Sequence, residues 1–455
     1  MSHNAARMHQ FDAQMADLIQ GYVRERLAMP ETPLDFPGDR LEMEAAIDGL
    51  LNERGTPAER VLDVYANQLA PTVLSTDSPR FLSFIPGAPT KASLLFDTVV
   101  SCASLQGMSW LEATGAIVAE NQVLRWIADE AGMPASAGGT FVSGGSMANL
   151  SSLFTAREVG RERTGKRQVR IALSEQAHSS IGLSLRLLDV APVIIETDDY
   201  RVTKASLQRT LDAYTDDEPI VAVVLTAGTT NAGLVDDIAG VSEITRARGM
   251  WLHVDGAYGG AGLLSPLTRH LYAGLEHADS FITDPHKWWF APFDCAAIIY
   301  REPALAAAVL KQDASYLDVL HDGMPANQIN PTDLAYHLTR RARGLALWFS
   351  VCVYGKDAYR EAVSSSIELA RATAELIHTL DHIELILEPT LSVVLWRRKG
   401  WELADYEALQ TQLLEAQIAF VTPTKWKGEA CGRFAFLHPE TSIELVEEIF
   451  ALCEQ

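Results

Sequence analysis

The chain has 455 residues, 48% of them hydrophobic, which is enough for one large core and a smaller second lobe. Its formal net charge of −22 argues against nucleic acids and anionic membranes as partners. No apolar run has the roughly 18 residues of a membrane span, and no signal-peptide pattern opens the sequence. The five cysteines show neither disulfide nor metal spacing, so we expect a cytoplasmic protein without a metal site.

The first 75 residues read as a helical arm. Apolar residues such as Leu18, Ile19 and Ile47 recur at helical spacing, and prolines between positions 30 and 37 divide the helices. Short helices of this kind cannot bury their apolar stripe alone. We therefore expect the arm to lie on the main body or on a second subunit.

Two apolar segments follow the arm. Phe84 and Ile85 lie in a loop bounded by prolines, and Trp110 precedes a helix expected from about residue 116 to 132. These side chains are candidates for the wall of a substrate pocket. They could equally fill the core, where large apolar residues are more often found.

Residues 138–150 predict a strand, a glycine turn and a helix that ends near residue 157. Gly145 and Ser146 stand at the start of this helix, where free backbone N–H groups bind anions and above all phosphate. An ordinary strand–turn–helix corner would look the same. The later match to a phosphate-binding loop at 160–166 is treated as chance, because Arg167 replaces the required Ser or Thr.

From residue 169 onward, short apolar runs alternate with segments of helical length. This pattern is typical of a parallel sheet covered by helices on both faces, with ligands bound at the carboxyl ends of the strands. The expected strands are 169–173, 193–196, 220–225, 251–254, 281–283 and 296–300.

Polar side chains follow several of these strands. They include His178, the segment 226–230, Asp255 and Lys287. Lys287 follows a proline break and precedes two tryptophans, so we expect an apolar environment in which its free amine is a nucleophile. A surface lysine lying over aromatic rings is the alternative.

Together these residues fit one ligand, pyridoxal 5′-phosphate. Gly145 and Ser146 would bind its phosphate, and Lys287 would form an imine with its aldehyde. Asp255 would pair with the ring nitrogen, and His178 would stack on the ring. Each residue has an ordinary structural explanation alone, but their joint appearance at strand ends favours the cofactor.

The last third of the chain predicts a loop, a long helix and a small lobe. Residues 316–337 form a polar loop of lid-like length. Three arginines near 340–343, structural or phosphate-facing, open a helix to about residue 380 that is broken near Gly355. Strands near 384–387 and 391–397 and helices near 405–417 and 442–452 complete a C-terminal α/β lobe. The expected domains are 1–75, 76–345 and 346–455.

The chain resembles a known enzyme family through motifs that occur in a fixed order. They are G-G-S-x-x-N, His178, T-A-G-T-T, H-V-D-G-A-Y, D-S-F-x-x-D-P-H-K-W and F-D-C. This set is similar to the group II pyridoxal-phosphate amino-acid decarboxylases, which include the aromatic-L-amino-acid, tyrosine and glutamate decarboxylases. The resemblance implies a type I, aspartate-aminotransferase-like α/β fold with a mainly parallel sheet. It also implies a homodimer with shared active sites.

The resemblance further implies roles for individual residues. Lys287, Asp255 and His178 would be catalytic in the decarboxylation of an L-amino acid. The remaining cofactor contacts would be Gly145, Ser146 and His286 at the phosphate, Ala257 under the ring opposite His178, and Thr230 beside His178 or the cofactor. Phe84, Ile85 and Trp110 indicate a substrate with an aromatic or other apolar side chain.

Two departures from the family pattern are visible. Asp284 stands where the family often has asparagine, which adds an acidic group near the cofactor. The loop tyrosine that protonates the substrate carbon is missing, because Asn330 or Pro331 falls at its position and Tyr336 lies several residues on. The missing tyrosine makes an aldehyde synthase one alternative. Arg433 keeps a transaminase open as a second, and a cofactor-binding dimer without turnover is the alternative outside enzymes.

Overall fold

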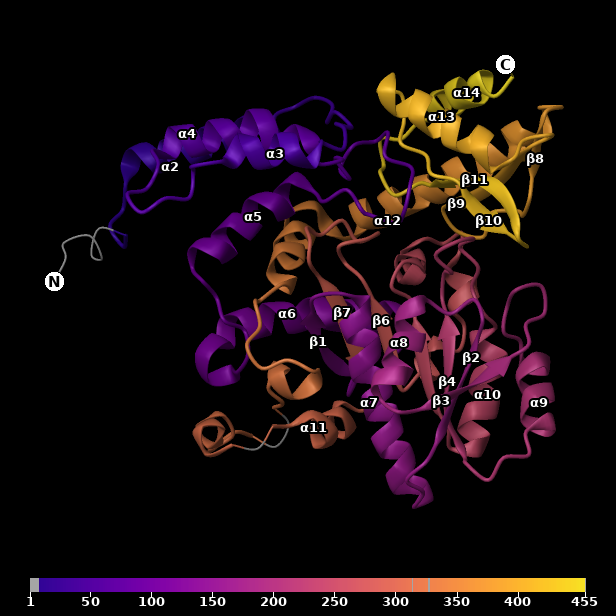
Figure 1. Ribbon diagram of the computed structural model, residues 1–455. Coiled ribbons are helices and arrows are strands. Elements are labelled where there is room, and N and C mark those ends of the chain that lie inside the picture. Colours follow the sequence, from indigo (N-terminus) through magenta and orange to yellow (C-terminus); the bar gives the residue numbers. More distant parts are fainter. Residues whose placement is uncertain (1–7, 313, 326–327, 455) are drawn as a thin grey trace.

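The computed structural model describes residues 8–312, 314–325 and 328–454, and it has three parts (Figure 1). An N-terminal arm extends from a large sheet domain, and a smaller lobe contains the C-terminus. Within the described residues, no helix combines the length and apolar character needed to cross a membrane.

The arm contains the α-helices α2, α3 and α4 and leads into α5 and α6. Asp12 and Asp39 begin the first two helices, because their carboxylates accept from backbone N–H groups of the first turn. No residue of α2 or α3 is buried, so the apolar stripe expected from the sequence is uncovered in a single chain. The helices are α2 (Ala13–Leu27), α3 (Arg40–Ile47), α4 (Ala58–Val64), α5 (Lys91–Cys102) and α6 (Trp110–Glu130).

The central sheet has seven strands in the order β1-β7-β6-β5-β4-β2-β3. Strands β2 to β6 pair in parallel, whereas β7 runs antiparallel to both β6 and β1. The expected mainly parallel α/β sheet is thus confirmed. The strands are β1 (Gly138–Val142), β2 (Arg170–Ser174), β3 (Ala191–Ile195), β4 (Ile220–Thr226), β5 (Trp251–Asp255), β6 (Ser280–Thr283) and β7 (Ala296–Tyr300).

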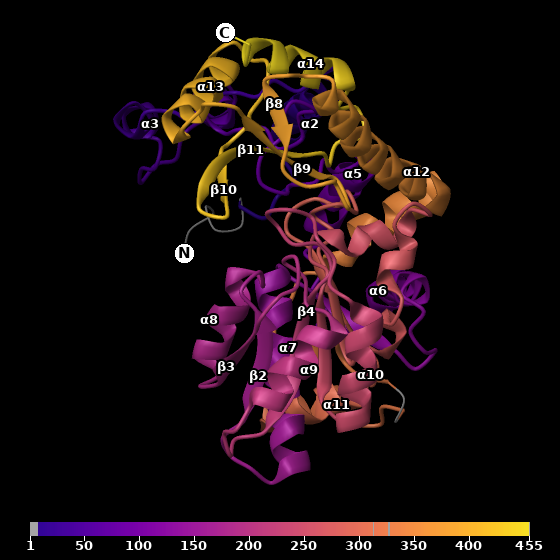
Figure 2. The ribbon, with the colours of Figure 1, turned by 90° about the vertical axis from the view of Figure 1, so that its right-hand side faces the viewer.

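Helices cover both faces of the sheet (Figure 2). Consecutive residues of a strand point to opposite faces of a sheet, and in β4 Val224 packs into one hydrophobic core and Leu225 into the other. Both faces are apolar and therefore need a covering layer. On the Val224 face lie α7 (Gly145–Thr164), α8 (Ser179–Leu187) and α11 (Pro303–Leu310). On the Leu225 face lie α6, α9 (Lys204–Ala213), α10 (Ile238–Arg248) and α12 (Gly344–His378).

The C-terminal lobe is a four-stranded antiparallel sheet with helices packed on it. Helix α12 leads into this lobe and bends at Gly355, whose φ of 82° lies outside the helical region, as the sequence predicted. Leu82 packs in the core of the lobe and forms backbone hydrogen bonds with Phe420 and Ala435. The adjoining loop with Phe84 therefore lies at the boundary between the lobe and the sheet domain. The elements are β8 (Ile383–Leu385), β9 (Val393–Arg398), α13 (Leu403–Glu415), β10 (Thr424–Trp426), β11 (Glu429–Ala435) and α14 (Ile443–Leu452).

The three arginines before α12 are structural in this chain. Arg340 is fully buried, and its Nη2 donates to both carboxylate oxygens of Glu120 on α6, at 2.7 and 2.8 Å. Arg341 pairs with Asp97, and Arg343 pairs with Asp294. Because each guanidinium has a carboxylate partner, the phosphate-facing alternative has no support here.

We expect Glu120→Ala to destabilise the fold by about 3–5 kcal/mol, because it leaves the Arg340 charge buried without a partner. The midpoint of urea unfolding measures this effect. Asp129→Ala on the same helix removes the exposed pair with Arg125 and should cost no more than about 1 kcal/mol. Equal shifts for the two variants would contradict the prediction.

Candidate active site

The carboxyl ends of β5 and β6 and the N-termini of α7 and α8 bring the predicted residues together. Lys287 contacts Asp284, and Asp284 accepts from the backbone of Gly145. The Asp284 N–H donates to the Ala257 carbonyl at 2.9 Å, and the Ala257 N–H donates to Asp255. From Asp255, hydrogen bonds lead through the side chains of Asn149 and Ser180 to His178.

The surroundings of Lys287 differ from the apolar environment expected from the sequence. Its Nζ lies 3.1 Å from Asp284 Oδ2. Both tryptophans that follow are completely buried: Trp288 stacks on Tyr258, and Trp289 donates to Thr283 Oγ1. The tight turn after Pro285 directs the two indoles into the core, so the immediate neighbour of the lysine is a carboxylate.

His286 lies on the same turn, at the phosphate side of the predicted site. Its Nδ1 accepts from the backbone N–H of Cys295 at 3.0 Å, so the proton of the neutral ring is on Nε2. Nε2 lies 3.6 Å from Asp284 Oδ2. Burial lowers the pKa of this imidazole, which favours a neutral donor over a cation.

Asp255 ends strand β5 and is almost fully buried. Asn149 Nδ2 donates to its Oδ2 at 2.9 Å, and the Ala257 N–H donates to its Oδ1 at 3.0 Å. Both carboxylate oxygens are therefore held by donors. This arrangement suits a fixed partner for a cationic ring nitrogen.

Asn149 connects Asp255 to a buried histidine that the sequence analysis did not assign. Since a carboxylate only accepts, Asn149 Nδ2 must face Asp255, and Oδ1 then faces His253 Nε2 at 2.9 Å. His253 Nε2 must carry the proton, and its Nδ1 accepts from Ser280, which itself accepts from Trp251. Burial lowers the pKa of His253 to about 4, so this ring is neutral in the fold.

His178 begins helix α8 at the other end of this network. The Ser180 hydroxyl lies 2.8 Å from His178 Nδ1, and Asn149 Nδ2 points at the same hydroxyl oxygen from 3.1 Å. Ser180 therefore accepts from Asn149 and donates to His178. The proton of a neutral His178 is then on Nε2, and the exposed ring is fixed in orientation for stacking.

The positions of Asn149 and His253 carry a signal that a sequence search could use. Asn149 lies one helical turn after Gly145, and His253 lies two residues before Asp255 on one face of β5. Both belong to motifs already recognised, G-G-S-x-x-N and H-V-D-G-A-Y. Only the fold shows that they contact each other.

We expect Asn149→Ala to lower kcat/KM about 10- to 100-fold, because it removes one hydrogen bond to a charged group and frees His253. Steady-state kinetics and the absorption spectrum of the bound cofactor measure this. Asn67→Ala, which removes a similar bond to Asp63 on the exposed arm, should leave both unchanged. A loss of stability with an unaltered spectrum would contradict a role in positioning Asp255.

The remaining predicted residues lie less centrally. Ser146 is exposed at the start of α7. Thr230 is exposed, and its carbonyl oxygen accepts from Arg433 at 2.6 Å. The same arginine donates to the carbonyl of Phe84, which is 61% exposed, whereas Ile85 is buried in the core. The next residues of this loop reach Lys287, since a Cβ at Gly87 would clash with its carbonyl oxygen.

Trp110 and the described residues of the loop 316–337 lie at the end of the sheet away from Lys287, near the first residue of β1. Trp110 donates to the carbonyl of Ile329 and borders a hollow lined by Gly138 at the far end of β1. Asn330 accepts from the Trp110 backbone, and Tyr336 is exposed on the outside of α7. Within one chain, no contact joins Lys287 to Trp110 or to the described residues of this loop, 316–325 and 328–337.

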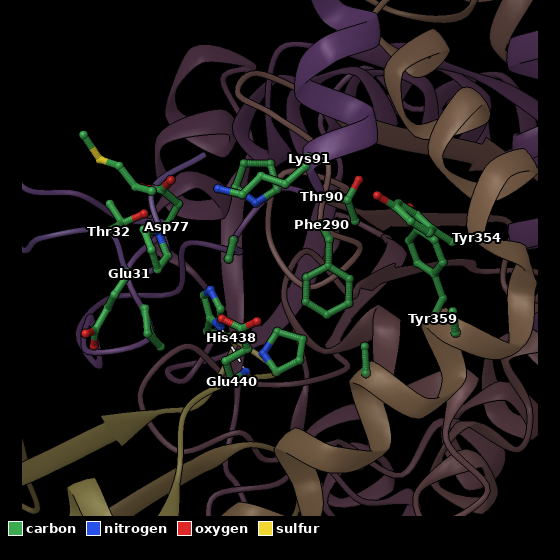
Figure 3. Close-up of a pocket in the computed structure, with 18 residues that line it drawn as sticks. Glu31, Thr32, Asp77, Thr90, Lys91, Phe290, Tyr354, Tyr359, His438 and Glu440 are labelled. Carbon is green, nitrogen blue, oxygen red and sulfur yellow. Dashed lines mark hydrogen bonds between the residues drawn. The ribbon is translucent and has the colours of Figure 1, made fainter. Parts of the chain in front are cut away.

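A separate cavity of about 490 Å³ lies between the arm, α5, α12 and the C-terminal lobe (Figure 3). It includes Phe290 but not Lys287, Asp255 or His178. Two of its carboxylates are already paired, Asp77 with Arg26 and Glu31 with Arg80. This cavity is therefore distinct from the site at the strand ends.

The fold and the site together define a type I pyridoxal-phosphate enzyme, and comparisons give the family. The model of the pyridoxal-dependent decarboxylase conserved domain matches residues 41–399. The chain thus belongs to the pyridoxal-dependent decarboxylases, carboxy-lyases that act on amino acids. The resemblance, cofactor and enzyme class predicted from the sequence are confirmed.

Curated relatives cover most of the chain. An aromatic-L-amino-acid decarboxylase from Bacillus atrophaeus is 27% identical over 99% of this chain and 96% of its own. An L-2,4-diaminobutyrate decarboxylase from Rhizobium meliloti (strain 1021) is 32% identical over 78% of this chain and 73% of its own. The relatives thus differ in the substrates for which they are named.

Solved structures confirm the fold. Oryza sativa TDC with PLP and tryptamine superposes with a TM-score of 0.84 at 23% identity, covering 100% of this chain and 98% of that one. Mouse CSAD in its apo form gives a TM-score of 0.87 at 20% identity, covering 97% and 98%.

The residues present fit pyridoxal phosphate. Gly144, the N-cap residue of α7, has no side chain to cap the helix, and the absence of a Cβ at Gly145 leaves room for an anion close to this helix end. An amine, a doubly held carboxylate and an oriented imidazole lie on the same contact path. These are the groups that an aldehyde, a ring nitrogen and a flat ring require.

Proposed function

We propose that this chain removes the α-carboxylate of an L-amino acid with an aromatic or other apolar side chain, with Lys287, Asp255 and His178 as catalytic residues. The supporting observation is the continuous series of contacts that runs from the lysine amine through Asp284, Ala257 and Asp255 to the exposed imidazole. It brings the amine, the carboxylate of Asp255 and the imidazole together at one edge of the sheet.

Pyridoxal phosphate, when bound, supplies the electron sink that makes loss of carbon dioxide possible. The chain would hold it by the N–H groups of Gly145 and Ser146, with His286 as a neutral donor. Asp255 would keep the ring nitrogen cationic, and His178 would cover one ring face. Lys287 would hold the aldehyde carbon covalently, yield to the substrate amine, and move protons at its Nζ.

The proposed substrate class rests on the loop beside Lys287. Phe84 is exposed, Phe81 and Phe420 lie next to it, and its carbonyl is held by Arg433. An apolar side chain near the lysine would contact this ring. A relative named for L-2,4-diaminobutyrate makes cationic side chains the main competing class.

A homodimer with shared sites is part of the proposal. Exposed apolar residues of the arm, α5 and α6 support it, because monomers rarely leave such patches uncovered. Sedimentation should give twice the chain mass. These residues are Met15, Ile19, Leu41, Leu95, Val99, Leu111 and Val118.

A second candidate is decarboxylation coupled to oxidation by molecular oxygen, which gives an aldehyde, ammonia and hydrogen peroxide. It is favoured by the loop, where Asn330 and Pro331 are buried and offer no phenol. The two candidates differ in products. An amine without hydrogen peroxide supports the decarboxylase, whereas aldehyde, ammonia and hydrogen peroxide in step with carbon dioxide support the second candidate.

Incubation of the holoenzyme with a panel of L-amino acids tests the proposal directly. Carbon dioxide and the matching amine should form fastest with an aromatic or aliphatic substrate. Preferential turnover of diaminobutyrate or glutamate would reject the apolar class. Accumulation of pyridoxamine phosphate with a keto acid would indicate transamination instead.

A further inference from the structure

Asp284 is a buried carboxylate that occupies the anion-binding end of α7. The residue is 1% exposed, and its Oδ2 accepts from the Gly145 N–H at 3.2 Å. A Cβ at Gly145 would lie 2.9 and 3.0 Å from the two carboxylate oxygens. The carboxylate therefore takes an N–H group that a phosphate at this helix end would use.

One oxygen of this carboxylate is left without a partner. Oδ1 is buried and makes no hydrogen bond to any residue that the structure describes. An unpaired buried oxygen is costly, so a proton donor that arrives with a ligand would be favoured here. Oδ1 is therefore the natural acceptor for a protonated anion at the start of α7.

Lys287 is the cation in contact with Asp284, and the other titratable groups near this carboxylate are neutral or already paired. Lys287 Nζ lies 3.1 Å away, and the first turn of α7 carries no acidic residue. His286 faces Asp284 as a ring whose pKa is lowered by burial. Nearby Asp294 pairs with Arg343, and Asp255 is held by Asn149 and the Ala257 backbone.

We propose that Asp284 competes with the cofactor phosphate for the N-terminus of α7, so that cofactor binding takes up one proton. This rests on the proposed placement of the phosphate at Gly145. A phosphate dianion and a carboxylate repel each other at one helix end. One solvent proton shared between a phosphate oxygen and Oδ1 gives an O–H···O bond with a total charge of −2, and no covalent bond to carbon or phosphorus changes.

The proton makes cofactor retention depend on pH. Because the complex holds one proton more than its separated parts, its dissociation constant rises with pH by up to about tenfold per unit. Asp284→Asn keeps the shape of the side chain and removes the charge. The variant should therefore lose this component of the pH dependence.

The test compares wild type and Asp284→Asn after removal and re-addition of the cofactor. Isothermal titration calorimetry at pH 8, in buffers of different ionisation enthalpy, counts the protons taken up. We expect about one proton more for the wild type, and at least about tenfold tighter binding of pyridoxal phosphate by the variant. Asp97→Asn on α5, at the partly exposed pair with Arg341, should behave as wild type.

Pyridoxal, which has no phosphate, separates this proposal from an effect through Lys287. The two proteins should bind pyridoxal equally. Wild type alone should take up about one proton more with pyridoxal phosphate than with pyridoxal, which keeps the test valid if the variant does not fold. Equal proton counts, or an equal affinity change for both ligands, would overturn the proposal. Failure of borohydride to attach the cofactor to Lys287 would instead reject the proposed function.

Discussion

Lys287→Ala should lower kcat by more than about 10³-fold, because it removes the amine that would hold the cofactor and move protons at the reacting carbon. Borohydride reduction of the wild-type holoenzyme followed by peptide mapping should label this residue. The variant should give no labelled peptide. It should also lack the absorption band of a covalently held cofactor.

Lys287→Arg separates this chemistry from the ion pair. Arginine keeps a cation beside Asp284, so the unfolding midpoint should stay near that of the wild type, while activity is lost as in the alanine variant. Lys204→Ala, at an exposed pair with Glu243, serves as the unaffected control. Substantial turnover by the arginine variant would rule out Lys287 as the covalent residue.

Asp255→Asn should lower kcat by about 10²–10³-fold, the effect of losing one fixed electrostatic partner in a buried site. The neutral amide cannot stabilise a cationic ring nitrogen. Its NH₂ group would also face one of two donors, Asn149 Nδ2 or the Ala257 N–H. The absorption of the bound cofactor should shift in parallel with the kinetic loss.

The matched control lies at the other end of the sheet. Asp279 precedes β6, and its carboxylate accepts from the backbone N–H of Leu252 at 2.8 Å. Asp279→Asn changes the same charge at the amino ends of the strands, so it should leave kcat and the spectrum unchanged. Similar kinetic losses for both variants would mean that stability, not the position of the charge, explains the effect.

Several predictions made from the sequence remain predictions. They include the domain limits 1–75, 76–345 and 346–455, the homodimer, the cytoplasmic location and the roles of individual site residues.

Two features of the fold were missed because their sequence pattern is ambiguous. Strand β7 was predicted, but its antiparallel direction was not. It is buried on both faces, and a continuous apolar run gives no indication of whether a strand pairs in parallel or antiparallel. Strand β11 contains Gly432, which packs against Trp396, and the buried Arg433, so it did not read as a strand.

The sequence by itself predicted the cofactor and the class of enzyme, both of which are confirmed. Buried strands are short apolar runs, and Asp255 and Lys287 end or follow such runs, so their order along the chain already predicted a cofactor site at one sheet edge. The tertiary structure alone decided which partner each group has. Asn149 meets Asp255 across 106 residues, and Asp284 meets Gly145 across 139, because parallel strands and their crossover helices bring distant turns to one edge. Local patterns contain no information on such contacts.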